Sequence, residues 1–225
     1  MKLHTMPQLS AEWYAVRVGL PTASEFSRIV TSTGEPSKSR RGYAMQLAAE
    51  LFAGEDLNRW GGNISTDRGR FLEEDGLRRY AFEQDAELEL IGFITDDDES
   101  FGCSPDSFVG DDGLAEVKCL NAEKHVATIL RYQNDGTIPP EFTQQTQGQL
   151  LITDRKWCDL VFYHPALPML VCRQEPIPAV QSGLLEGIAS LIEERDEILK
   201  TLIAMRDGPP SESMADWKSD ANPAR

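Results

Sequence analysis

The residues best suited to chemistry in this sequence are three charged side chains near its middle, Asp106, Glu116 and Lys118. Asp106 lies at a bend between predicted strands, and the turn at 110–113 (GDDG) folds it back towards Glu116. Glu116 and Lys118 are two residues apart, so a strand projects both from one face. Two converging carboxylates and the Val117 carbonyl suit Mg²⁺, and a lysine beside the metal can orient a water. The pattern predicts metal-dependent hydrolysis of a phosphodiester.

These residues also have an ordinary interpretation. A turn aspartate and a cross-strand glutamate–lysine pair occur in many sheets, and a short Pro-Asp…Glu-x-Lys pattern often arises by chance. Other chemistries have weaker support. The four cysteines form no CxxC pair, and the three histidines are scattered, which disfavours a zinc or iron–sulfur site and a histidine-based nuclease.

A second group, near the N-terminus, is suited to binding a phosphate. The guanidinium of Arg17 can hold phosphate oxygens bidentately. Residues 22–25 (TASE) form a capping-box pattern that predicts a helix capped by Thr22 and running to Val30. Ser24 would lie in its first turn, where free N–H groups and the helix dipole favour an anion. The alternatives are an Arg17 ion pair with a surface carboxylate and Ser24 as a second local cap.

The elements that must position these residues follow from hydrophobic periodicity and turn signals. The chain is helical up to about residue 84, and strand patterns begin at residue 87. Helices are predicted after Ser10 and at 22–30, 39–53, 67–84, 121–133, 141–153 and 177–206, and strands at 87–95, 101–104, 114–119, 157–163 and 168–174. This order predicts the α/β class, with a mixed central β-sheet flanked by helices.

The charge of the chain argues against a nucleic-acid substrate only if the charge is evenly spread. The 225 residues carry a formal net charge of -15. Residues 1–80, however, hold 11 Lys plus Arg against 10 Asp plus Glu, so the acid excess lies after residue 80. The N-terminus lacks the apolar region of a signal peptide, and no apolar run reaches the roughly 18 residues of a membrane helix. We therefore expect a cytoplasmic protein without a membrane partner.

Several short motifs, in consistent order over most of the chain, resemble one nuclease family. The sequence resembles lambda exonuclease and the YqaJ-type viral recombinases, the phage recombination exonucleases of the PD-(D/E)xK nuclease superfamily. The matching motifs are Trp13, Arg17-Val-Gly19, the TASE segment 22–25, Gly69–Glu73, Cys103–Asp106, Gly113-Leu114, Glu116–Cys119, Gln145-Thr-Gln147 and Tyr163-x-Pro165. The departures are Arg68, which stands where the family example has an aromatic residue, Leu120 in place of the family's proline, and the loop at 54–66, which could contact a duplex end.

The resemblance implies a role for each matching position. Asp106 and Glu116 would bind metal with the Val117 carbonyl, and Lys118 would position the attacking water. The other roles concern a second metal and the DNA end. Glu73 would be a further acidic group near the second metal, directly or through water, and Arg17, Ser24 and Gln145 would hold a terminal 5′-phosphate, with Thr22 and Gln147 as weaker candidates. Gln145 is preferred to Gln147 because residues two apart on a helix point to different faces.

The resemblance also implies a PD-(D/E)xK nuclease-like core and an activity. The expected enzyme is a Mg²⁺-dependent, processive 5′-to-3′ exonuclease on double-stranded DNA, with two metal ions and Mn²⁺ as a substitute. It would release 5′-mononucleotides and leave 3′ single-stranded tails. The expected partners are DNA ends with a 5′-phosphate, two further copies of the chain in a homotrimeric ring, and a phage single-strand annealing protein in a bacterial host.

The domain organisation follows from the same elements. One exonuclease domain is expected over 1–207, with a helical part at 10–84, a catalytic sheet core at 87–174 and a long helix at 177–206, followed by a flexible tail at 208–225. Two alternatives for function stay open. The first is a structure-specific or restriction-type endonuclease with the same metal core. The second is non-enzymatic, either an acidic DNA mimic or a protein-interaction domain.

Overall fold

The computed structural model describes residues 1–57 and 64–208. Residues 58–63 of the predicted 54–66 loop and 209–225 of the predicted tail lie outside this part. The elements are β1 (Lys2–His4), α1 (Ala11–Arg17), η1 (Ala23–Arg28), α2 (Arg40–Ala53), α3 (Ile64–Gln84), β2 (Leu88–Leu90), β3 (Phe93–Thr95), β4 (Gly102–Cys103), β5 (Ser107–Val109), β6 (Gly113–Lys118), α4 (Ala122–Asp135), η2 (Pro140–Phe142), α5 (Thr143–Thr153), β7 (Trp157–Phe162), β8 (Leu170–Gln174) and α6 (Pro178–Asp207).

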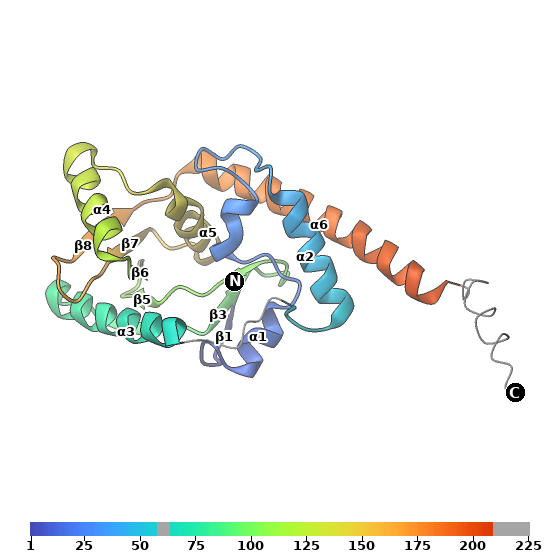
Figure 1. Cartoon of the computed structure of the whole chain (residues 1–225), viewed down its shortest axis with the longest axis horizontal. Helices are drawn as coiled ribbons and strands as arrows, with labels where there is room; N and C mark the ends of the chain where they lie inside the picture. The colour runs from blue at the N-terminus through green and yellow to red at the C-terminus, as the bar shows by residue number, and fades with distance from the viewer. Residues whose placement is uncertain (58–63, 209–225) are drawn as a thin grey trace, which may run out of the picture.

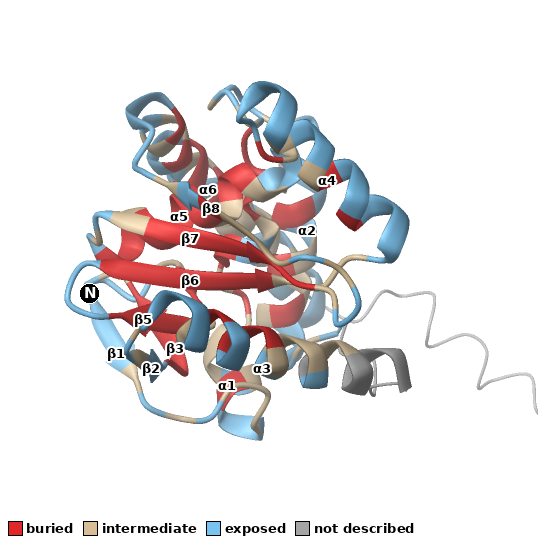
Figure 2. Ribbon diagram, turned by 90° about the vertical axis from the view of Figure 1, so that its left-hand side faces the viewer, coloured by how far each residue is buried: buried red, intermediate tan, exposed pale blue. Residues whose placement is uncertain are grey.

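A five-stranded mixed sheet in the order β2-β5-β6-β7-β8 forms the centre of the fold (Figures 1 and 2). Strands β6 and β7 are parallel, and the other three pairs are antiparallel. Ala115 and Val117 of β6 pack with Leu77 of α3 on one face. Leu114 packs on the opposite face with residues of α2, α5 and α6. The predicted α/β class with a mixed sheet flanked by helices is confirmed, and the alternation along β6 turns Glu116 and Lys118 towards α5.

Two glycines allow helices to lie unusually close to the residues beneath them. A Cβ atom at Gly76 of α3 would be 2.8 Å from a methyl carbon of Val117 on β6. A Cβ atom at Gly148 of α5 would be 2.4 Å from the ring of Phe26 on η1. Both separations are too short for a real side chain, so these positions need glycine if α3 is to contact the sheet and α5 is to contact η1.

The predicted strand at 87–95 was wrong in one respect, because it is two strands in different sheets. Strand β2 joins the five-stranded sheet, whereas β3 pairs with β1 and β4 in a separate antiparallel sheet. The chain crosses between the sheets at Gly92, where a Cβ atom would lie 2.1 Å from the carbonyl oxygen of Met6. Apolar residues continue through this crossing, so the predicted strand was extended across the break. Strand β1 was not predicted.

The predicted helix at 22–30 is also corrected. Residues Ala23–Arg28 form a short 3₁₀ helix, and the Thr22 side chain makes no capping hydrogen bond to it. Instead, the Thr22 hydroxyl lies 3.3 Å from the Ser24 hydroxyl and 3.5 Å from a guanidinium nitrogen of Arg17. The capping box is therefore not formed, and an anion here would depend on side chains rather than on the end of a long helix.

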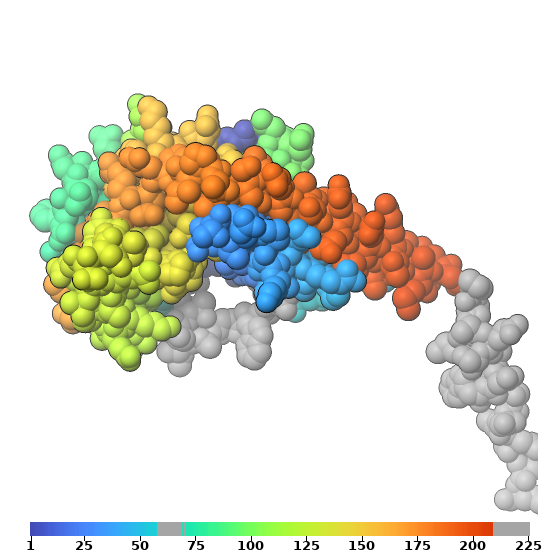
Figure 3. Space-filling model, turned by 90° about the horizontal axis from the view of Figure 1, so that it is seen from above, coloured from blue at the N-terminus to red at the C-terminus, as the bar shows by residue number. Residues whose placement is uncertain are grey.

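Helix α6 packs on the body of the molecule with its N-terminal half and projects from it with its C-terminal end. Val180, Leu184 and Leu191 are buried in its N-terminal half, where the helix packs on α2. Its C-terminal end extends beyond the other elements, and Met205 there is exposed (Figures 1 and 3). Within 1–57 and 64–208, no helix has the length and apolar composition required to cross a membrane.

Candidate active site

Asp106 and β6 are joined by a short hydrogen bond. The Val117 amide donates to a carboxylate oxygen of Asp106 at 2.6 Å. Asp106 lies between β4 and β5, and β5 pairs with β6 only as far as Ala115, so the Val117 amide is left for the aspartate. The amide and carbonyl of one strand residue point to the same edge, so the Val117 carbonyl is directed to the Asp106 side.

Glu116 is held by three donors on the face of the sheet that α5 covers. The ammonium of Lys118 donates to one carboxylate oxygen at 2.7 Å, and the Gln145 amide donates to the same oxygen at 2.6 Å. The Gln149 amide donates to the other oxygen at 2.7 Å. Lys118 also donates to the Gln145 side-chain carbonyl at 2.9 Å. Because Glu116 is only 4% exposed, these bonds replace the water that its charge would otherwise require.

The charges at this site are not balanced. Removal from bulk water raises the pKa of Asp106 well above its ordinary value, and the nearby Glu116 raises it further. Burial lowers the pKa of Lys118, but the attraction and hydrogen bond to Glu116, together with attraction to Asp106 and Glu73, outweigh burial and leave that pKa raised. Lys118 therefore stays protonated beside two carboxylates. A further positive charge would stabilise the pair.

The side chains fit a divalent metal, although they do not enclose one by themselves. Within the described residues, no group of three or more His, Cys, Asp or Glu side chains is arranged to hold a metal ion. Asp106, Glu116 and the Val117 carbonyl offer the hard oxygen atoms that Mg²⁺ prefers. Glu73 of α3 lies with Asp106 on the wall of a cavity of about 410 Å³ and also raises the pKa of Asp106. A metal bound by these atoms would need water or phosphate oxygens to complete its coordination.

The predicted phosphate-binding residues come together in a smaller cavity of about 140 Å³. Arg17, Ser24 and Gln145 all line it, from α1, η1 and α5. The guanidinium of Arg17 lies 3.9 Å from the centre of the Trp13 ring, and burial lowers the pKa of this arginine. The cavity walls also include Ser104 and Trp13, whose indole N–H donates to the Ser104 hydroxyl at 2.9 Å.

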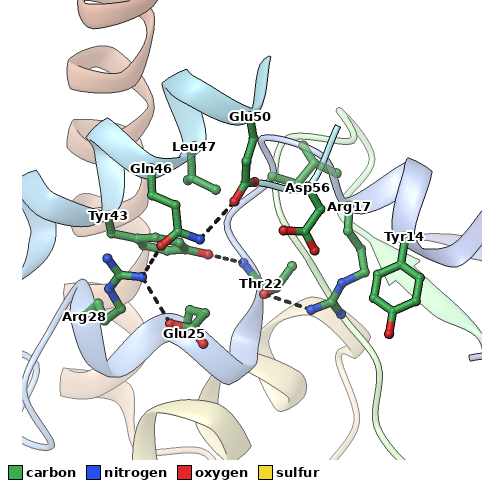
Figure 4. Close-up of a pocket in the computed structure, with 11 residues that line it drawn as sticks. Tyr14, Arg17, Thr22, Glu25, Arg28, Tyr43, Gln46, Leu47, Glu50 and Asp56 are labelled. Atoms are coloured by element: carbon green, nitrogen blue, oxygen red, sulfur yellow. Dashed lines mark hydrogen bonds and ion pairs between the residues drawn. The ribbon is translucent and has the colours of Figure 1, made fainter. Parts of the chain in front are cut away.

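Arg17 and Thr22 line this small cavity and also a larger one of about 300 Å³, which Figure 4 shows. The larger cavity contains a second arginine, Arg28, which donates to the Gln46 side chain at 2.7 Å. Its wall also carries carboxylates, among them Glu25. Thr22 therefore lies between the two cavities, with its backbone N–H donating to the Tyr43 hydroxyl at 3.1 Å.

Comparison with known proteins places this arrangement in a family. The YqaJ-like viral recombinase domain matches residues 12–156, which include all the predicted site residues. The chain belongs to the YqaJ-like viral recombinase family. Among curated protein sequences, none matches this one.

Solved structures support this membership in the YqaJ-like family. An alkaline exonuclease from Laribacter hongkongensis, LHK-Exo, is 30% identical, with a TM-score of 0.76 over 88% of this chain and 98% of that chain. The same protein in complex with dAMP is also 30% identical, with a TM-score of 0.75 over 86% and 96%. A phage-related exonuclease from Haemophilus somnus 129PT is 13% identical, with a TM-score of 0.64 over 81% and 96%, and shows a similar fold.

Gln147 makes different contacts from Gln145 in this member of the YqaJ-like family. Its amide nitrogen donates to the Glu175 carbonyl at 2.9 Å, and its side-chain oxygen accepts from the Ile177 amide at 2.6 Å. The side chain is fully buried and joins α5 to the start of α6. Gln145, two residues earlier, instead reaches Glu116 and the small cavity.

Two residues of the site were absent from the sequence prediction. Gln149 could have been predicted from helix geometry, because it lies four residues after Gln145 and therefore on the same face of α5. Gln8 was not, because no local pattern marks it. Its amide donates to the carbonyl of Pro105 at 3.1 Å and to that of Ile91 at 2.8 Å, which ties the N-terminal segment to the turn that carries Asp106.

Proposed function

We propose that this protein is a metal-dependent 5′-to-3′ exonuclease on double-stranded DNA, which releases 5′-mononucleotides and leaves 3′ single-stranded tails. One observation carries the proposal. Gln145 donates to Glu116 in the acidic centre and also lines the cavity that contains Arg17 and Ser24. A phosphate in that cavity would lie beside the acidic centre, as a terminal phosphate must if the next phosphodiester is to be cut. The exonuclease activity named for LHK-Exo supports the same assignment.

In the proposed mechanism, Asp106, Glu116 and the Val117 carbonyl would hold Mg²⁺, Glu73 would serve a second ion, and Mn²⁺ would be a substitute. The bound metal would neutralise charge on the scissile phosphate and lower the pKa of water. Lys118 keeps its proton and donates to Glu116 and Gln145, so its remaining N–H can hold the attacking water. Arg17 and Ser24 would bind the terminal 5′-phosphate and so fix the direction of degradation.

The remaining proposals concern assembly and context, and they rest on family membership. We place the protein in the cytoplasm of a bacterial host as a phage or prophage enzyme. There it would work as a homotrimeric ring, stay on its DNA through many cleavage steps, and pass the 3′ tail to a single-strand annealing protein. A ring would retain an acidic protein on DNA without a strongly cationic surface.

A time course on linear duplex, with each strand labelled separately, tests the activity. We expect 5′-labelled ends to be released first as mononucleotides, with Mg²⁺ required and 5′-phosphorylated ends preferred over 5′-hydroxyl ends. Arg17→Ala should reduce this preference more than it reduces cleavage of hydroxyl ends, because it removes a phosphate ligand. Supercoiled circular DNA is the control. Its cleavage would favour the endonuclease alternative, and release from 3′ ends would overturn the polarity.

A further inference from the structure

The cavity of about 410 Å³ beside Asp106 is larger than the metal centre requires. One part of its wall is acidic, with Asp106 and Glu73, and another is aliphatic. The aliphatic part combines the N-terminal segment, helix α3 and the end of β2 through Met6, Pro7, Leu9, Leu77 and Leu90. A wall of this kind suits a flat, weakly polar group that is joined through a sugar to a phosphate, as the base of a nucleotide is.

Two unusual features lie on this wall. Leu9 has a φ of 67°, in the left-handed region that a leucine rarely adopts. Leu90, at the end of β2, is 76% exposed. Backbone strain and exposed large apolar side chains are both costly in isolation, and they concentrate where a ligand is bound. Their occurrence together at one cavity indicates that the cavity binds something.

The position of the cavity identifies the ligand. Gln8 lines both this cavity and the small one with Arg17 and Ser24, and Asp106 lies on the side of the larger cavity. The terminal phosphate belongs to the first nucleotide and the scissile phosphate joins that nucleotide to the second, so the first nucleotide would extend along Gln8 from the small cavity to Asp106. The next nucleoside would then lie beyond Asp106. On the basis of the proposed function, we propose that this aliphatic cavity binds the base of the second nucleotide from the 5′ end, after that base has separated from its complement.

The cavity would accept any of the four bases. Three backbone carbonyls around it already have donors, since Gln8 binds those of Ile91 and Pro105 and Trp13 binds that of Gly92. Each of those carbonyls therefore keeps only one lone pair with which to read a base edge. Contact with an aliphatic wall depends on the face of the base, which all four bases share. This property suits an enzyme that must degrade every sequence.

The test measures the rate of the first cleavage under single-turnover conditions. The substrates are 5′-phosphorylated duplexes with an abasic site at position 1, 2 or 3 of the degraded strand. Each abasic duplex is compared with one that has a mismatched base at the same position, because the mismatch removes pairing but keeps the base. We expect the abasic site at position 2 to slow cleavage about 5- to 10-fold, the lower part of the range for contacts to one base. Positions 1 and 3 should change it less than about twofold.

Two variants test whether the cavity causes the effect. Leu9→Gly removes a wall side chain and suits the left-handed backbone, and Leu90→Ser changes a side chain that is already exposed. Both should slow cleavage of normal duplex and abolish the difference between abasic and mismatched position 2. Leu130→Ser, at an exposed leucine on α4, is the matched control and should behave as wild type.

The outcomes separate this inference from the proposed function. A largest effect at position 1 or 3, no position effect, or an unchanged position 2 effect in both cavity variants would overturn the cavity assignment alone. If the wild-type enzyme does not cut the unmodified 5′ end, the proposed function fails and the cavity assignment fails with it.

Discussion

Two buried carboxylates on neighbouring strands of the central sheet have contrasting surroundings. Asp159 of β7 lies opposite Ala115 of β6, on the face covered by α3, whereas Glu116 is turned to the face covered by α5. Asp159 accepts two hydrogen bonds from Arg173, at 2.8 and 2.9 Å, and one from the Tyr80 hydroxyl at 2.7 Å. Its charge is matched by one guanidinium.

The surroundings of Glu116 hold an excess of negative charge, whereas the surroundings of Asp159 are balanced. Asp106 and Glu116 are served by one lysine, and the raised pKa of Asp106 follows from burial beside Glu116. A balanced buried pair can stabilise a fold, whereas an unbalanced one destabilises it until a cation arrives. We therefore interpret the Asp159 cluster as structural, anchoring α3 to the sheet, and propose that the Asp106–Glu116 pair is functional. This comparison predicts opposite responses to mutation on the two faces.

The largest effect should come from Asp106→Asn. We expect cleavage to fall by roughly 10³-fold or more, since the variant loses a charged metal ligand worth several kcal/mol in the transition state. The melting temperature of the metal-free protein should rise by about 2–4 °C, the shift for about 1 kcal/mol in a protein of this size. Asparagine can still accept from Val117 but carries no buried charge. Calorimetry with a chelator measures the shift, and a lower melting temperature would mean that Asp106 is balanced after all.

Lys118→Ala is the companion variant. It should also abolish cleavage, but it should lower stability because Glu116 loses the cation that contacts it. Equal stability changes in the two variants would remove the charge argument.

Asp159→Ala should have the next largest effect, on stability rather than on activity. It leaves the buried Tyr80 hydroxyl without its acceptor and removes the partner of Arg173, whose side chain is 53% exposed and can return to water. We expect a loss of about 2 kcal/mol, most of it from the unsatisfied hydroxyl. Chemical denaturation measures this loss. Cleavage per folded molecule should remain within about threefold of wild type at temperatures well below the transition, and a loss comparable to that of Asp106→Asn would contradict a structural role.

The sequence predicts the residues around Glu116 better than those around Asp159, for physical reasons. Glu116 and Lys118 were predictable because strand periodicity places residues i and i+2 on one face, and Asp106 because a short turn returns it to the same place. The class of the fold followed from the order of elements. Thr22 and Gln8 could not be assigned in this way, because their contacts depend on how η1 and the N-terminal segment pack against distant residues. Asp159 likewise gave no signal, since its partners come from α3 and β8.

Gln149→Met should have a smaller effect, on the acidic centre only. The variant keeps the shape of the side chain but removes the donor to Glu116. Loss of such a supporting hydrogen bond typically costs 10- to 100-fold in metal affinity or activity, and we expect the lower value. The Mg²⁺ concentration for half-maximal cleavage measures it. Gln147→Met, on the same helix, is the control. It should lower thermal stability without changing the Mg²⁺ dependence, because Gln147 binds backbone groups near α6.

The smallest effect should come from Tyr80→Phe, which removes one hydrogen bond from the balanced cluster. Arg173 would still neutralise Asp159, so only the contribution of the hydroxyl is lost, about 1 kcal/mol. The ring remains packed under α3 with Leu77 and Val161. Glu73 is on the same helix, but the loss of one hydrogen bond should not displace α3, so the Mg²⁺ dependence of cleavage should stay unchanged. A shifted Mg²⁺ dependence in this variant would show that the Asp159 cluster influences metal binding, and the division between a structural and a functional carboxylate would have to be abandoned.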